Sequence, residues 1–282
     1  MQLIMRLALS LFFLHIFLVF CSCSQEPTNP NPDMAAIAPT PSRISAANAS
    51  LFVPSGLTWR TQHYEAENCN IQATDDMDLD GWCATRSVDI IILSLNNKPA
   101  AQKINQALVK RITGNGTQLN DVNQYVQQVK LKNISDEEGD VAQEEVMCKV
   151  VDTSSNFCAI SINTYYYALG AAHGTNSVDV LNFDLQDGSL ITLDRLIDFS
   201  KKNSLTALAK KKFLQQNEGD DWWFTSGEEP FTLPEVFVLE RKGIRFIYQQ
   251  YEIGPYAAGI PEVFLSKQDL MSYLKVNPFL VP

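Results

Sequence analysis

Three aspartates at alternating positions, Asp76, Asp78 and Asp80, are followed by Gly81 and have the spacing of a cation-binding loop. A D-x-D-x-D-G run places carboxylates where a Ca²⁺ loop holds its first ligands, with the glycine making the turn. The twelfth position of such a loop is Ser87 instead of a bidentate glutamate. The sequence leaves open a weak calcium site and a solvated acidic loop that binds no ion.

Two further groups of side chains could contact a ligand. His173 lies among small residues at 170–174, where it could face a cleft or be hydrogen-bonded within a tight turn. Trp222 and Trp223 come directly after two aspartates, and such aromatic side chains could stack on a sugar or anchor a protein partner. The alternative for the tryptophans is packing in a hydrophobic core.

No set of residues in the sequence matches a catalytic motif. A G-x-S-x-G nucleophile turn, an H-E-x-x-H zinc motif and a P-loop are all absent. The chain has only 3 histidines, and His173 has no nucleophile motif beside it. The sequence therefore predicts no catalytic residues, a protein that is not an enzyme, and no cofactor apart from the candidate calcium ion.

The N-terminus has the features of an export signal. Arg6 precedes an apolar run over 7–20, too short for a comfortable membrane span, and Cys23 comes after the small residue Ser22. This arrangement resembles the lipobox of bacterial lipoproteins, and a plain secretory signal is the alternative. We expect a lipoprotein signal peptide at 1–22, lipidation of Cys23, and a place in the bacterial cell envelope, anchored to a membrane at its periplasmic face or in the outer membrane.

Beyond the signal peptide the composition of the chain changes. Residues 23–55 are rich in proline and small polar residues, which predicts a disordered tether. The chain carries 22 basic and 32 acidic residues, a net charge of −10. Removing residues 1–22 removes one arginine and no acid, which makes the charge −11. An acidic protein is unsuited to binding nucleic acid and suited to a cationic partner.

Four cysteines lie beyond the export signal, and an exported chain with an even number of cysteines is expected to form disulfides. Three pairings are possible, and geometry favours the local ones, Cys69 with Cys83 and Cys148 with Cys158. The second pair flanks a turn at 152–155 between two β-rich runs. Spacings of 14 and 10 residues do not fit a structural zinc site.

Hydrophobic periodicity and turn residues predict an α+β fold. Its antiparallel sheets are built from hairpins, helices pack on one face, and two small domains succeed one another along the chain. Strands are expected at 57–73, 85–95, 141–151, 157–169, 178–185, 235–240, 243–249 and 259–265, and helices at 99–114, 119–129, 201–217 and 266–274.

Three stretches carry a family resemblance: YYYALGAAHG at 165–174, NFDL at 182–185 and YEIGPYAAG at 251–259. They resemble the RsiV-like C-terminal domain family, although Ala171 stands where that family commonly has glycine. Residues 56–160 are similar in element order to the PdaC-type N-terminal domain, which leaves 161–282 for the RsiV-like domain. The resemblance implies an envelope protein, and relatives include an anti-sigma factor whose outer domain binds lysozyme and a cell-wall deacetylase with a separate catalytic module.

These observations favour a non-catalytic envelope lipoprotein that binds a protein ligand, lysozyme or a related cell-wall hydrolase. Its contact is expected around 170–174 and 251–259, with His173, Tyr256, Trp222 and Trp223 as ligand-binding residues. The alternative is a protein that binds or modifies peptidoglycan or another glycan through the aromatic side chains and carboxylates.

Overall fold

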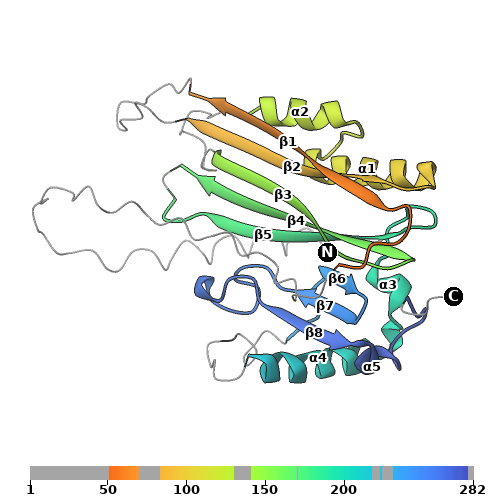
Figure 1. Cartoon of the computed structure of the whole chain (residues 1–282). Coiled ribbons are helices and arrows are strands. Elements are labelled where there is room, and N and C mark those ends of the chain that lie inside the picture. The colour runs from red at the N-terminus through yellow and green to blue at the C-terminus, as the bar shows by residue number, and fades with distance from the viewer. Residues whose placement is uncertain are drawn as a thin grey trace, which may run out of the picture. The chain divides into compact units, whose positions relative to one another are not determined.

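The computed structural model describes residues 51–69, 83–129, 141–169, 171–217, 223 and 231–278. They form a five-stranded sheet in the order β1-β2-β3-β4-β5 and a three-stranded sheet in the order β6-β7-β8, with helices packed on them, which confirms the α+β class (Figure 1). The elements are β1 Thr58–Asn68, β2 Ala84–Ser94, α1 Lys98–Thr113, α2 Leu119–Gln127, β3 Val141–Thr153, β4 Phe157–Ala168, β5 Thr175–Asp184, α3 Leu193–Leu196, α4 Lys202–Gln216, β6 Phe237–Glu240, β7 Gly243–Ile247, β8 Glu262–Ser266 and α5 Lys267–Leu270. Among the described helices, none combines the length and apolar character that crossing a membrane requires.

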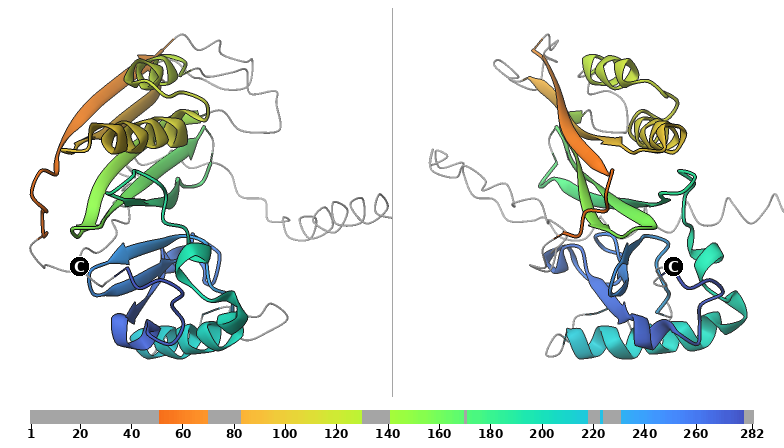
Figure 2. Two further views of the ribbon diagram at one scale, coloured as in Figure 1. Left: turned by 90° about the vertical axis from the view of Figure 1, so that its right-hand side faces the viewer. Right: turned by 45° about the vertical axis from the view of Figure 1, so that its right-hand side comes forward.

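The five-stranded sheet is mixed, because β2 pairs with β3 in parallel, for example Val88 opposite Val146, while the other neighbours are antiparallel. This pair is the one departure from the predicted antiparallel pairing among the described strands. The chain between β2 and β3 passes through α1 and α2, and a crossover of this length returns the chain in its original direction. Both helices lie on the same face of the sheet, α1 against β2 and α2 against β1 (Figure 2).

Helix α1 begins and ends where its sequence predicts. The Asn97 side chain accepts a hydrogen bond from the Ala100 amide, and Pro99 occupies the first turn, where no helical donor is lost. Gly114 ends the helix with φ 83°, a left-handed conformation that favours glycine. Between these ends, Ile104 and Leu108 are fully buried against the sheet.

The second sheet has its own aromatic core. Helix α4 packs on β8 and places Phe213 among Trp223, Phe231 and Tyr248, with ring centroids 5.0–5.8 Å apart. The helix α5 opens with a capping box in which Ser266 and Asp269 each hydrogen-bond the other's backbone amide. This cap, with Asp269 at the third helical position, confirms the start predicted for the helix at 266.

The two sheets meet through side chains rather than through a continuous ladder. Strand β5 is an edge strand, and the Asn182 amide bridges it to β6 by donating to Phe237 O (2.8 Å) and accepting from Leu239 N (2.7 Å). Gln249 likewise accepts from Val178 N (3.0 Å) and donates to Val178 O (2.8 Å). These amides satisfy edge groups that would otherwise be free to pair with another strand.

The boundary placed between 160 and 161 falls inside β4, with Ile160 and Ser161 both hydrogen-bonded into the ladder to β3 and β5. The five-stranded sheet continues through β5 to Asp184. A boundary inside β4 would break that ladder, so the position of this boundary is corrected to a point beyond β5.

One of the two predicted disulfides is present. Cys69 and Cys83 are bonded, whereas Cys148 and Cys158 are buried free thiols. The hairpin of β3 and β4 forms as expected, but its register pairs Cys148 with Ile162 and Cys158 with Thr153. Four residues of strand therefore separate the two thiols along the ladder, about 13 Å, which is too far for a disulfide.

Candidate functional site

Two segments that the sequence singled out lie against each other in the structure. The rings of His173 and Tyr256 stack with centroids 4.0 Å apart and an angle of 29° between their planes. The Tyr256 hydroxyl donates to the carbonyl of Gly174 at 3.0 Å. His173 Nδ1 is also 3.1 Å from that carbonyl, so His173 is both exposed at the surface and hydrogen-bonded in its turn.

A third ring completes an aromatic platform, defined here as His173, Tyr251 and Tyr256. Tyr251 lies 5.8 Å from Tyr256 and is 54% exposed, among the most exposed large side chains described. Its φ of 65° makes it the non-glycine residue with a left-handed backbone in the described chain. This conformation is costly for a bulky residue, and strained backbone of this kind clusters at binding and catalytic sites.

The loop that carries Tyr251 and Tyr256 is held from several sides. The Gln250 side chain accepts from the Asn176 amide at 2.7 Å, which ties the loop to the start of β5. Beneath the loop, Gly254 lies so close to the Trp223 ring that a Cβ there would come within 2.8 Å of it. These contacts fix the rings before any ligand arrives.

Trp223 is only 8% exposed and packs edge-on against Phe213. Its expected role as a ligand contact is corrected to one of support, because the aromatic core of the second sheet buries the ring. Trp222, Cys23 and the candidate calcium ligands Asp76, Asp78 and Asp80 lie outside the described residues.

Carboxylates extend from the platform across the sheet. On the face turned away from α1 and α2, the register aligns Glu65, Ser87, Glu145 and Tyr165 in one row over four strands. Side chains in such a row lie on the same face as direct neighbours. Gly174 joins this row to the platform, since a Cβ there would lie 2.3 Å from the Tyr165 ring. Burial, together with the nearby Tyr256 and Glu145, raises the pKa of Tyr165, so its hydroxyl stays protonated.

The adjacent row contains the one histidine of this face. His63 Nδ1 lies 2.8 Å from Asp89, its cross-strand partner, and Nε2 lies 3.6 Å from Glu65. The hydrogen bond to Asp89 raises the pKa of His63 above its ordinary value. The surface beside the platform is therefore rich in carboxylates, and His63 partly neutralises it as the pH falls.

The structure offers one cluster of metal-ligating atoms within its described ranges, formed by Glu67, Cys69 and Cys83. Because the two cysteines are joined in a disulfide, they provide no thiolate for a metal. This cluster is therefore part of the disulfide and is not a metal site.

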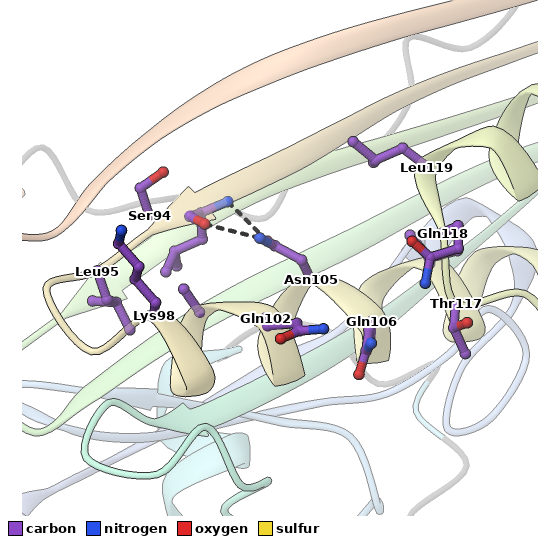
Figure 3. Close-up of a pocket in the computed structure, with 12 residues that line it drawn as sticks. Ser94, Leu95, Lys98, Gln102, Asn105, Gln106, Thr117, Gln118 and Leu119 are labelled. Carbon is purple, nitrogen blue, oxygen red and sulfur yellow. Dashed lines mark hydrogen bonds between the residues drawn. The ribbon is translucent and has the colours of Figure 1, made fainter.

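A groove of about 490 Å³ runs beside α1, on the side of β2 (Figure 3). Leu93 is among the residues that line it, together with the amide side chains of Gln102, Gln106 and Gln118. The Asn105 amide, which points into this region, is already hydrogen-bonded to Leu93 N and O at 2.9 Å each. It replaces a missing strand partner at the end of β2 and is therefore not available to a ligand in the groove.

Comparisons with known proteins agree with the fold. Residues 195–268 match the model of a family described as protein of unknown function DUF3298. A DUF3298 family member from Bacteroides fragilis has a similar structure, with a TM-score of 0.65 and 19% identity over 79% of this chain and 96% of that one. A DUF3298 family protein from Pseudomonas aeruginosa is also similar, with a TM-score of 0.59 and 18% identity over 80% of this chain and 98% of that one. No curated protein matches the chain. The described structure thus shares the fold of solved DUF3298 family proteins, with the family match on α4 and the second sheet.

Proposed function

We propose that this chain is a non-catalytic lipoprotein of the bacterial envelope that binds a cationic protein, lysozyme or a related cell-wall hydrolase. The observation that carries the proposal is the platform of the exposed His173 and Tyr251 with the half-buried Tyr256, joined through Gly174 and Tyr165 to a row of carboxylates. The RsiV-like resemblance of 165–174 and 251–259 supports the same class of partner.

The chemistry of the surface fits a protein better than a small ligand. Large aromatic side chains on a preorganised loop are the residues that dominate protein interfaces, because each buries much area at little cost in side-chain entropy. The neighbouring carboxylates of Glu65, Glu145 and Glu252 would steer a basic partner and set its orientation. Steering of this kind weakens as salt screens the charges.

Calorimetric titration with hen egg-white lysozyme tests the proposal. We expect a complex in low salt that weakens at higher salt, and we expect Tyr251→Ala to weaken it about 30-fold, the loss of roughly 2 kcal/mol at an interface anchor. Tyr251 is 54% exposed, so its removal leaves the core intact. Glu145→Gln should weaken binding less and reduce the dependence on salt.

The matched control is Phe199→Ala, which removes another exposed ring (41%) from the short 3-10 helix Phe199–Lys201, outside the platform. This variant should bind as the wild type does. If no heat of binding is detected at low or at high salt, and circular dichroism shows that the protein is folded, the proposal is contradicted. Equal losses in both variants would mean that the platform is not the contact.

The proposed membrane anchor is tested separately. A Cys23→Ala variant has no thiol to acylate at the predicted lipobox, so we expect it in the soluble fraction, whereas the wild type should sediment with membranes and incorporate labelled palmitate. A variant that still sediments, together with a wild type that carries no fatty acid, would rule out lipidation at Cys23. Calcium binding at Asp76, Asp78 and Asp80 also stays a prediction.

A further inference from the structure

A cleft of about 450 Å³ lies on the helix-bearing side of the five-stranded sheet, on the face opposite the row of carboxylates. Its floor is formed by Val146 and Ile162, and one wall is formed by Ile112 and Tyr125. The other wall is formed by Val236 and Gln249, which lie just before β6 and just after β7. A cleft of this size with a mainly apolar lining and a few polar groups is typical of small-molecule sites.

Glu144, which lines the cleft, belongs to a buried charged pair with Arg86 behind it. The Glu144 carboxylate accepts from Arg86 Nε and from the Tyr125 hydroxyl, both at 2.6 Å, and the side chains of Glu144 and Arg86 are 12% and 13% exposed. The Arg86 guanidinium also lies 4.2 Å above the Tyr125 ring. Burial raises the pKa of Tyr125, so the hydroxyl keeps its proton and donates. A buried ion pair adds little stability over apolar packing, so this pair is not explained by stability alone.

A second charged pair stands at the mouth of the cleft. Arg111, from the last turn of α1, forms an ion pair through Nε with Asp179 of β5. The Arg111 side chain is 58% exposed, and its terminal NH₂ groups carry four further donors. Asp179 is 25% exposed. The rim can therefore donate hydrogen bonds without presenting an unbalanced charge.

Two hydroxyl groups lie side by side in the lining. Thr164 of β4 and Ser177 of β5 are direct cross-strand partners, and both line the cleft. Over the stretches of chain that the structure covers, neither hydroxyl has a hydrogen-bond partner. Direct partners on antiparallel strands have Cβ atoms about 5 Å apart, so the two hydroxyls can serve neighbouring groups of one ligand.

Charge balance selects the class of ligand. The charged groups that line the cleft are already paired, Arg111 with Asp179 and Glu144 with Arg86, so a charged ligand would lose hydration without gaining a free counter-charge. The groups with unused capacity are hydroxyls, guanidinium N–H groups and carboxylate lone pairs, which suit a molecule that both donates and accepts. We propose that this cleft binds a neutral saccharide of one or two rings, with its C–H faces against Ile112 and Tyr125.

This proposal goes beyond protein binding by the platform and does not depend on it. The test is a titration of ¹⁵N-labelled protein with cellobiose, maltose and N,N′-diacetylchitobiose, followed by amide shifts and saturation-transfer NMR. We expect millimolar binding of at least one sugar, with the shifts centred on the residues that line the cleft. The double variant Thr164→Val and Ser177→Ala keeps the side-chain shapes close to those of the wild type and should raise the Kd at least fivefold.

Thr85→Val is the matched control, because Thr85 lies on β2 opposite Gln143, on the other face of the sheet, and its loss should leave the Kd unchanged. Glucose is titrated as the neutral monosaccharide, and glucosamine and glucuronate should each bind more weakly than glucose. No shift with any neutral sugar, an unchanged Kd in the double variant, or tighter binding of a charged sugar would each overturn the proposal. Lysozyme binding should be the same in the double variant, which separates failure here from failure of the platform.

Discussion

Replacing Asn182 with alanine is expected to lower the free energy of unfolding by about 2–5 kcal/mol. Asn182 is 2% exposed, and both ends of its amide bond the backbone of β6. Alanine would leave the carbonyl of Phe237 and the amide of Leu239 without partners in a buried junction. Each buried group left unsatisfied costs about 1–3 kcal/mol, and the cavity adds to this.

Urea unfolding followed by circular dichroism measures the effect. Asn115→Ala is the control, because Asn115 is exposed in the turn after α1, and we expect it to change stability by less than about 0.5 kcal/mol. A loss below about 1 kcal/mol for Asn182→Ala would contradict the role assigned to the amide. The junction would then depend on the apolar contacts of Val178, Val180 and Val238.

The sequence predicted those elements whose signals are local. Pro99 and Gly114 marked the ends of the helix predicted at 99–114, and two β-rich runs around a turn indicated the β3–β4 hairpin. Pairings between distant strands have no such local signal. The parallel contact of β2 with β3 depends on how the helical crossover returns, and the side-chain bridge from Asn182 to β6 spans more than fifty residues of chain.

The same distinction holds for the candidate site. His173 and Tyr256 were found through stretches that resemble a family, and the structure brings their rings together. Trp223 carries the same aromatic signal but lies in the core, since an aromatic residue's type alone does not show which way it faces. Thr164 and Ser177 are unremarkable in sequence, and only the β4–β5 register shows that their hydroxyls are neighbours.

The register also governs the two cysteines that were expected to pair. In the folded protein, Cys148 and Cys158 are expected to resist iodoacetamide at pH 8, and in denaturant both should react without a reductant. They are 4% and 0% exposed, and burial raises the pKa of each thiol from an ordinary value of 9.0 to about 12. At pH 8 only about one thiol in ten thousand would be the reactive thiolate, even before access is considered.

Intact mass measured on a chain in which Cys21 and Cys23 are replaced by serine counts the reacted thiols. We expect none in the native protein, two in denaturant, and four after reduction opens the Cys69–Cys83 bond. Two alkylations in the native state would contradict the buried positions. If neither thiol reacts in denaturant without a reductant, Cys148 and Cys158 are bonded to each other as first predicted, which would require a shifted β3–β4 register. Folding raises the pKa of both thiols from 9.0 to about 12, so between these values the unfolded chain ionises more readily than the folded protein. The contribution of the two thiols to the free energy of unfolding should therefore be unchanged below about pH 9 and should be lost as the pH rises toward 12.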